Sequence, residues 1–452
     1  MRLPQQAPAL SELVLEVDLN ADLPKILEAI STPDEQGTYW HWEDVRRQPA
    51  PSGLTRRYRW LGLKFRRGTM ARQLPLKSTT DRQFTYGLTD SALEALHWID
   101  QHSAGEILIS EGVTEPAEQK RYLVNSLMEE SITSSQLEGA SVTRKVAKDM
   151  LRSGRPPRDR GERMILNNYR AMTRLRELAE SPLTTDIVFD LHRILTEGTL
   201  EDPDAAGRPQ QPGDARVRVY SPENQVVHVP PSAEELPDRL AAMVQFANGE
   251  SPDSFVHPVI RAIVLHFWLA YDHPFEDGNG RTARALFYWE MLKQGYWMFE
   301  YLSISSLLVK APAQYARAFL YTESDEFDAT YFILHQLKVI RRAVDELMAY
   351  LRRKAEETRR TVSLLRNTTL NHRQVALMTH ALRHPDYEYT ILSHAQSHGV
   401  VRQSARTDLL DLERRGLLVR RRSGRKYFFY AADDLQGRLQ RESGDGSIQL
   451  AG

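Results

Sequence analysis

The residues best suited to chemistry lie together in the stretch YDHPFEDGNGRTAR, residues 271–284. Its histidine, His273, has a side chain that can take a proton near neutral pH. Asp277 offers an oxygen ligand of the kind that Mg²⁺ prefers. The sequence Gly278-Asn279-Gly280 comes directly before a strong helix pattern, where backbone N–H groups and the helix N-terminus favour an anion. The stretch therefore indicates a site that binds phosphates and deprotonates a hydroxyl group.

Two arginines extend this phosphate interpretation. Arg281 and Arg284 are three positions apart, so they share one face of the helix, and their planar side chains suit phosphate oxygens. A charged loop between two core helices is the plain structural alternative. A zinc site at His273 and Asp277 is disfavoured, because the sequence has no HExxH and no second histidine nearby. The chain also lacks GxxxxGK[ST], which argues against a P-loop NTPase.

The segment HPFEDGNGRTAR matches the pattern H-x-F-x-[D/E]-G-N-G-R-x-x-R at every defined position. In this the chain resembles the Fic (filamentation induced by cAMP) family over about residues 90–340. The resemblance implies transfer of AMP from ATP, with Mg²⁺, to a Tyr, Ser or Thr hydroxyl of a target protein or of the chain itself. It implies His273 as general base, Asp277 as the Mg²⁺ ligand and Phe275 as the anchor of the loop in the core. It also implies an anion hole formed by Gly278, Asn279 and Gly280. Arg281 and Arg284 would bind the outer phosphates.

A second motif, SSQLEG, occupies residues 134–139. It is similar to the inhibitory motif of the same family, [S/T]-x-x-x-E-[G/N], with Ser134, Glu138 and Gly139 at the defined positions. The resemblance implies an inhibitory helix over about residues 118–139, whose Glu138 pairs with Arg284 and displaces a phosphate. In some relatives the equivalent glutamate also supports removal of AMP, so de-AMPylation at the same site is an alternative. The plain structural alternative is a solvated glutamate at a helix end.

A loop and a short exposed hairpin are expected beside the site, within residues 207–231, because this segment is rich in Pro and Gly and has alternating Val. In the Fic family a hairpin at this place, the flap, holds the target by strand addition, which needs little from the target sequence. The corresponding residues here are Val226, Val227, His228 and Val229. The alternative is a surface loop.

The elements around these motifs are expected to be helical, because apolar residues recur at i, i+3, i+4 and i+7 from about residue 90 to residue 360. The predicted fold is therefore mainly α: an all-helical Fic core with a small β-hairpin flap, a C-terminal winged helix-turn-helix and a small mixed or β-rich N-terminal region. The expected limits are residues 1–90, 91–365, 366–435 and a disordered tail at 436–452.

The C-terminal region differs in charge from the rest. Between Ser397 and Tyr430 there are nine Lys or Arg and three acidic residues, a local balance of +6 in a chain of net charge −1. The order of three helices and a basic hairpin resembles a winged helix-turn-helix, a module that binds DNA or docks proteins. The candidate DNA contacts are Arg402, Gln403, Ser404, Arg406, Arg421 and Arg425.

The bulk composition limits the remaining classes. The 452 residues contain no cysteine, which excludes disulfides, thiolate metal sites and a cysteine nucleophile. Neither a secretory signal nor an apolar run of membrane length is evident, so we expect a cytoplasmic protein without a membrane partner. The main alternative to an enzyme is a nucleotide-sensing, DNA-binding transcription regulator. Relatives form homodimers, but no stretch here predicts one.

Overall fold

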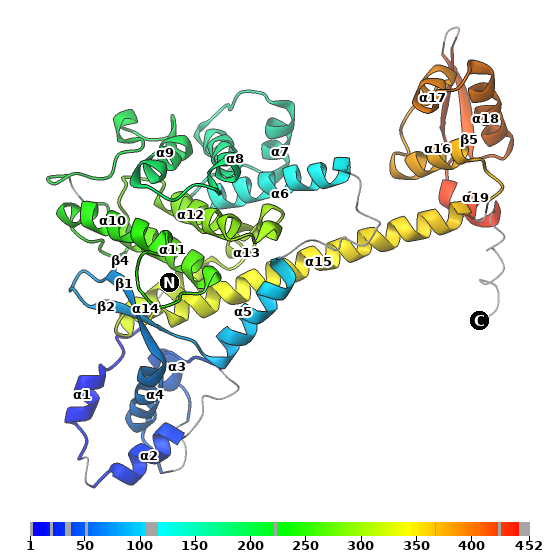
Figure 1. The fold of residues 1–452 in the computed structure, drawn as a ribbon. Coiled ribbons are helices and arrows are strands. Elements are labelled where there is room, and N and C mark those ends of the chain that lie inside the picture. Colours follow the sequence, from blue (N-terminus) through cyan, green and yellow to red (C-terminus); the bar gives the residue numbers. More distant parts are fainter. Residues whose placement is uncertain are drawn as a thin grey trace. The chain divides into compact units, whose positions relative to one another are not determined.

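The structure is a computed structural model that describes residues 3–18, 21–31, 38–49, 53–104, 116–214, 216–220, 224–366, 368–423 and 426–442. It divides into two compact units, of which one extends to residue 347 and the second begins at residue 348 (Figure 1). The chain is mainly helical, as predicted. Among the described helices, none has both the length and the apolar composition needed to cross a membrane.

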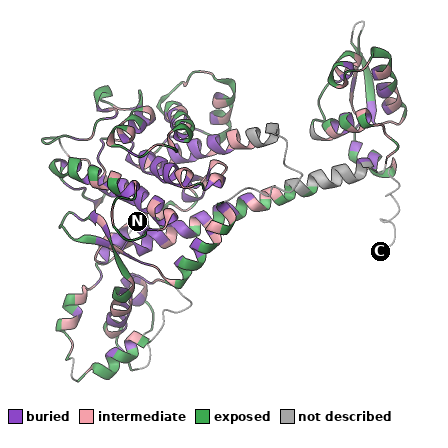
Figure 2. Ribbon diagram, viewed as in Figure 1, coloured by how far each residue is buried: buried purple, intermediate pink, exposed green. Residues whose placement is uncertain are grey.

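Two helices form the centre of the first unit. Helix α11 (Pro258–Asp272) and helix α12 (Asn279–Lys293) are buried along most of their length (Figure 2). Helix α11 is apolar on most sides, as expected of a buried helix, whereas α12 also buries the charged residues Arg281, Arg284 and Glu290. They pack against each other and against their neighbours α8 (Arg160–Leu178), α9 (Thr185–Thr196) and α10 (Leu236–Ala247).

The turn between α11 and α12 is set by local sequence. Proline at position 258 suits the first turn of α11, where no N–H partner is lost. The helix ends at His273, which has left-handed backbone angles of φ 46° and ψ 53°. Gly278 precedes α12 with φ 85°, and a Cβ there would lie 2.6 Å from Cγ2 of Thr196. Glycine is therefore required at this position, both for its backbone angle and for its close approach to α9.

Further helices surround this pair in the first unit. Helix α6 (Pro116–Leu137) packs on α8 and on α13 (Ser305–Leu308). Its Glu130 is buried and accepts hydrogen bonds from the Tyr288 hydroxyl at 2.9 Å and the Ser305 N–H at 3.0 Å. These bonds fix α6 on the core just before the predicted inhibitory motif. The other helical elements are α7 (Arg144–Ser153), η2 (Pro203–Ala205), η3 (Ala233–Glu235), η4 (Trp297–Glu300) and α14 (Pro312–Ser324). Helix α15 (Thr330–Arg366) begins in the first unit and ends in the second.

The N-terminal region packs on the same unit rather than standing apart. Its helices are α1 (Leu10–Leu15), α2 (Leu23–Ser31), α3 (Trp42–Val45), α4 (Arg56–Met70) and α5 (Asp90–Ser103). Its described strands form one antiparallel hairpin, β1 (Ala71–Lys77) with β2 (Gln83–Gly87), so the region is mixed rather than β-rich. Thr85 of β2 also bonds to the turn before α15, accepting from Ala329 N at 2.8 Å and donating to Phe327 O at 3.1 Å.

The second unit contains α16 (His372–Arg383), α17 (Ile391–His398), α18 (Arg402–Arg414) and the antiparallel pair β5 (Leu418–Ser423) and β6 (Lys426–Ala431). The prediction of disorder from residue 436 is wrong for its first part, because α19 (Leu435–Glu442) is helical. Leu435 and Leu439, four residues apart, are buried in the core of this unit with Phe429. Residues 443–452 lie outside the described part of the chain.

Candidate active site

The site begins with His273, at the end of α11. Its side chain is half-buried, and its Nδ1 lies 3.3 Å from the carbonyl oxygen of Ala270. A carbonyl can only accept, so Nδ1 carries the hydrogen and Nε2 is the nitrogen able to accept a proton. Burial lowers the pKa of His273 to about 4, which leaves the ring neutral at physiological pH. The residue thus has the tautomer and charge of a general base.

The loop after His273 is anchored by Phe275, whose side chain is fully buried. The Asn279 amide bonds to both backbone groups of Phe275, accepting from its N–H at 2.9 Å and donating to its carbonyl at 2.8 Å. The side chain of Asn279 therefore shapes the loop from within. What it can offer to an anion is its backbone N–H at the start of α12, where the first N–H groups have no carbonyl partner within the helix.

His192 of α9 packs against the same loop and bonds to it. Its ring stacks on Phe275 with centroids 3.7 Å apart, and its Nε2 lies 2.8 Å from the carbonyl oxygen of Asp277. Its Nδ1 accepts from the N–H of Gly207 at 2.9 Å. Burial lowers the pKa of His192 to about 4, which agrees with one protonated and one accepting nitrogen. The histidine therefore holds the loop as a neutral ring.

Arg281 lies in the first turn of α12 and is fully buried. Its Nη1 donates to the carbonyl oxygen of Leu195 at 2.7 Å, but its Nε and Nη2 have no hydrogen-bond partner among the described residues. Its nearest carboxylate oxygen, Oδ2 of Asp277, is 3.7 Å from Nη2. Buried donors without partners are uncommon in folded proteins, and here they lie beside the glycine-rich turn. An anion placed there would satisfy them.

Arg284 is fully engaged by the end of α6. Its Nε donates to the Ser134 hydroxyl at 2.8 Å, and its Nη2 donates to the Ser134 carbonyl at 3.0 Å and to Glu138 Oε1 at 2.8 Å. A Cβ at Gly280 would lie 2.1 Å from that same carboxylate oxygen. The Glu138 carboxylate therefore lies against the backbone of the glycine turn. Gly139, with φ 91°, allows the chain to turn away after it.

Asp277 lies at the open side of the loop, with about a third of its side chain exposed. One carboxylate oxygen accepts from Gly278 N at 2.6 Å, and the other pairs with Arg160 Nη2 at 2.9 Å. Arg160 is mostly exposed and also donates to Thr199 O at 2.8 Å. The described residues contain no cluster of three or more His, Cys, Asp or Glu able to hold a metal ion. Asp277 alone fits Mg²⁺, which usually uses one or two carboxylates together with substrate phosphates.

Comparison with known proteins agrees with this geometry. Residues 182–291, which include the loop, match the family model described as Fic/DOC family. The chain contains a Fic/DOC domain. A solved structure of a Fic family protein from Desulfovibrio desulfuricans G20 has the same fold, with a TM-score of 0.54 and 19% identity over 77% of this chain and 97% of that one.

Two curated relatives share shorter segments with this Fic domain. Protein adenylyltransferase Fic of Nematostella vectensis is 39% identical over 69 residues, which are 15% of this chain and 16% of the relative. Protein adenylyltransferase fic-1 of Caenorhabditis elegans is 32% identical over 114 residues, which are 25% of this chain and 20% of the relative. The chain thus spans a fifth or less of the length of these relatives.

A hairpin lies beside the Fic loop where a flap was predicted. Strand β3 (Val219–Tyr220) pairs with β4 (Val226–His228), and Val226 and Val229 are exposed. His228 differs from its neighbours, because it is buried and both ring nitrogens have partners. Its Nδ1 lies 2.8 Å from Glu323 Oε2, and its Nε2 lies 2.7 Å from Tyr271 O.

Arg216 connects the segment after this hairpin to the loop between α11 and α12. Its guanidinium donates to Pro231 O and Asp272 O, each at 2.8 Å, and to His273 O at 3.2 Å. Sequence reasoning missed Arg216, His192 and Arg160. Of the three, His192 alone could have been suspected from the sequence, because it is a histidine on the apolar face of a predicted helix. Arg216 and Arg160 look like ordinary charged surface residues.

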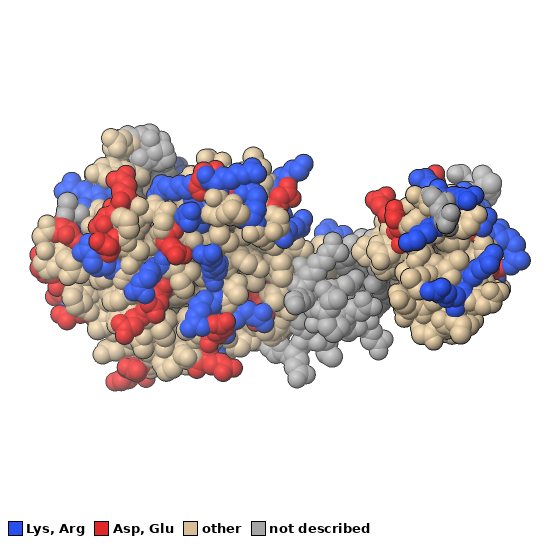
Figure 3. Space-filling view, turned by 90° about the horizontal axis from the view of Figure 1, so that it is seen from above, with Lys and Arg blue, Asp and Glu red and all other residues tan. Residues whose placement is uncertain are grey.

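The residues proposed for DNA contact lie in the second unit. Arg402, Gln403 and Arg406 are exposed near the start of α18, and Ser404 is half-buried. Arg421 is exposed on β5, and Arg425 lies outside the described residues. The exposed Lys and Arg of this unit are visible in Figure 3.

Proposed function

We propose that the protein is an adenylyltransferase that transfers AMP from ATP to a hydroxyl side chain of a protein and is inhibited by its own Glu138. One observation supports this above the others. The Glu138 carboxylate lies against Gly280 and pairs with Arg284, while two donors of the neighbouring Arg281 make no hydrogen bond among the described residues. The Glu138 carboxylate thus occupies one part of an anion site, and the remaining hydrogen-bond donors of that site suit a larger anion.

The residues present fit the phosphates of ATP. The first N–H groups of α12, the glycines before them and the buried guanidinium groups of Arg281 and Arg284 form a concave, positively polarised surface. Mg²⁺ would be held by Asp277 once Arg160 gives up its pairing with that carboxylate. The ion supplies neutralisation of phosphate charge when bound.

The chain's own residues would act as follows. Nε2 of His273 takes the proton of the target hydroxyl, whose oxygen forms a bond to the α-phosphorus. The bond from that phosphorus to the bridging oxygen breaks, and pyrophosphate leaves. The N–H groups at Gly280 and the side chain of Arg281 stabilise the charge on the phosphates. Arg216 fixes the backbone of His273, so the base has a defined position relative to the flap.

Inhibition follows from the contact of Glu138 with Arg284. A phosphate that reaches Arg284 must displace the carboxylate from a charge-assisted hydrogen bond of 2.8 Å. Since Arg284 is almost fully buried, its charge is poorly screened by water, and the competition is strong. The buried Glu130 network holds α6 in place, which favours release of the Glu138 side chain rather than of the whole helix.

The test uses ATP labelled at its α-phosphate, Mg²⁺ and a cell lysate as the source of target. We compare the wild type, Glu138→Gly and Glu138→Gly/His273→Ala, with Glu250→Gln as a control at an exposed glutamate away from the loop. We expect weak labelling of protein by the wild type, strong labelling by Glu138→Gly and loss of labelling in the double variant. Absence of label in all variants would contradict the proposal, and so would labelling that survives loss of His273.

The second unit supports a further candidate function, DNA binding through a winged helix-turn-helix. The favouring observation is that Arg402, Gln403 and Arg406 are exposed together near the start of α18, where such modules contact bases. Exposed arginines on β5 would contact phosphates as a wing. Duplex binding by the full chain should weaken steeply as salt rises from about 50 to about 200 mM. Binding that is absent at low salt, or unchanged in Arg402→Ala/Arg406→Ala, would exclude this role.

A further inference from the structure

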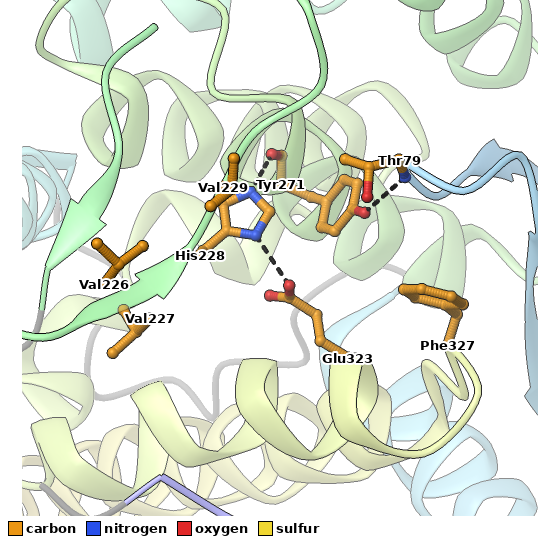
Figure 4. Close-up of a pocket in the computed structure, with 8 residues that line it drawn as sticks. All are labelled: Thr79, Val226, Val227, His228, Val229, Tyr271, Glu323 and Phe327. Carbon is orange, nitrogen blue, oxygen red and sulfur yellow. Dashed lines mark hydrogen bonds and ion pairs between the residues drawn. The ribbon is translucent and has the colours of Figure 1, made fainter. Parts of the chain in front are cut away.

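A cavity of about 300 Å³ opens between the flap and the N-terminal region (Figure 4). Val226, Val227 and Val229 line one side, and the rings of Tyr271 and Phe327 line another. The volume is at the lower end for ligand sites, so it suits one side chain rather than a whole cofactor. We name it the flap pocket.

A carboxylate lies at the centre of the flap pocket. Glu323 of α14 pairs through Oε2 with His228 Nδ1 at 2.8 Å, and about a quarter of its side chain is exposed. Its second oxygen, Oε1, has no hydrogen-bond partner within the described part of the chain. Carboxylates readily accept from two cations at once, so Oε1 can take a charged donor from outside. The valine and aromatic walls would cover the aliphatic stem of such a donor.

The flap pocket is close to the catalytic histidine. His228 donates through Nε2 to the carbonyl oxygen of Tyr271 at 2.7 Å, and Tyr271 precedes His273 by two residues on the same helix end. Strands β3 and β4 form a two-stranded sheet among the described residues, which leaves one edge of β4 without a partner strand. A segment that adds to this edge would place every second side chain on one face, about 7 Å apart. One side chain can then reach His273 while a neighbour enters the flap pocket.

We propose that the flap pocket selects targets that carry a lysine or arginine within three residues of the modified hydroxyl, by binding that basic side chain to Glu323. The proposal rests on the adenylyltransferase function and names the class of protein segment that it prefers. An arginine would gain further from stacking on Phe327 or Tyr271. If the pocket had apolar walls and no free acceptor, it would instead favour an aliphatic or aromatic side chain of the target.

The same pocket gives the N-terminal region a role that its sequence did not indicate. Thr79, in the turn between β1 and β2, lines the pocket and donates its N–H to the Tyr271 hydroxyl at 3.1 Å. Phe327 has a left-handed backbone with φ 63°, which is unusual for a bulky residue. Thr85 of β2 holds this turn by two backbone bonds, one of them to Phe327. The N-terminal hairpin therefore builds one wall of the pocket.

The experiment maps modified sites across a proteome. Full-length Glu138→Gly protein is incubated with ATP, Mg²⁺ and a cell lysate, and the proteins are digested with chymotrypsin, which does not cut at basic residues. Mass spectrometry then gives the residues that flank each adenylylated site, compared with all Tyr, Ser and Thr of the same lysate. The same is done with Glu323→Gln, Glu323→Lys and the matched control Glu250→Gln, each in the Glu138→Gly background.

We expect Lys or Arg to be enriched about tenfold at one position within three residues of the site, as one charge-assisted hydrogen bond at the low end of its range would give. Glu323→Gln should remove the enrichment, Glu323→Lys should replace it by Asp or Glu, and Glu250→Gln should leave it unchanged. Labelling without any such preference, or with a preference that Glu323→Lys does not change, overturns the inference and leaves the adenylyltransferase function standing. Absence of labelling overturns both.

A nucleotide in the flap pocket is the competing outcome, and it is measured directly. If the pocket held part of ATP, Glu323→Gln would raise the KM for ATP severalfold and leave the flanking sequences unchanged, which would overturn the inference. If it holds the target, the KM for ATP stays within about twofold while the sites change. Thermal unfolding of each variant shows whether loss of the Glu323 pair to His228 affects folding.

Discussion

The pH dependence of AMP transfer tests the assignment of His273 as a buried general base. The base must be unprotonated to accept the hydroxyl proton, and burial lowers its pKa to about 4. At pH 5.5 a base of pKa about 4 is roughly 97% unprotonated, whereas one with the ordinary histidine pKa of about 6.5 is roughly 9% unprotonated. The structure therefore predicts about tenfold more activity at pH 5.5 than a solvent-exposed histidine would give. The Glu138 carboxylate raises the pKa of His273, so its removal in Glu138→Gly lowers this pKa further and the ring stays neutral at pH 5.5.

The assay measures kcat/KM for a protein acceptor with Glu138→Gly, at saturating ATP and Mg²⁺, between about pH 4.5 and pH 8. At saturating ATP this ratio reports the pKa of the base in the ATP-bound enzyme before the acceptor binds. We expect little change from pH 8 to about pH 5 and a decline below that. Protein held at pH 4.5 and returned to pH 7.5 must regain full activity, which separates titration from unfolding. A fall to half of the plateau near pH 6.5 would refute the reasoning that burial keeps this ring neutral.

Three substitutions test the parts around the base. Ser134→Ala removes one hydrogen bond that orients Arg284 toward Glu138, so labelling by the otherwise wild-type chain should rise, by up to about tenfold; unchanged labelling would show that this bond does not hold the inhibited state. Gly280→Ala in Glu138→Gly places a Cβ where the carboxylate lies, so transfer should fall about a hundredfold, as for loss of an anion-hole donor; retained activity would place the phosphates elsewhere. His192→Leu leaves the carbonyl of Asp277 and the N–H of Gly207 unpaired, so the Tm should fall by at least about 3 °C in thermal unfolding. An unchanged Tm would mean that water replaces the hydrogen bonds of the ring.

The residues of the candidate loop could be grouped from the sequence because they are neighbours in it. Histidine, aspartate, glycines and arginines lie within twelve positions, and helix patterns on both sides place them between two core helices. Glu138 is 146 residues from Arg284, and their contact could be expected because both motifs have recognisable patterns. The mainly helical fold follows from the same periodicity.

The supporting residues could not be predicted because their roles depend on contacts between distant segments. Arg216 bonds to carbonyls 56 and 57 residues away, and an exposed-looking arginine in a Pro- and Gly-rich loop gives no sign of such partners. Arg160 reaches Asp277 across 117 residues. Helix α19 was missed because a short polar segment has little helical preference until Leu435 and Leu439 find a core to pack against.

The geometry of the inhibited site also indicates how firmly it is held. Glu138 pairs with Arg284, yet Nε and Nη2 of the buried Arg281 make no hydrogen bond among the described residues, and the Asp277 carboxylate is 3.7 Å from Nη2. A buried donor without a hydrogen bond costs about 1–3 kcal/mol, so Nε of Arg281 favours binding of an acceptor such as a phosphate. A phosphate that satisfies Arg281 gains that energy before it meets Glu138. The triphosphate and Glu138 then compete for Arg284 alone, and one glutamate side chain is enough to prevent binding there.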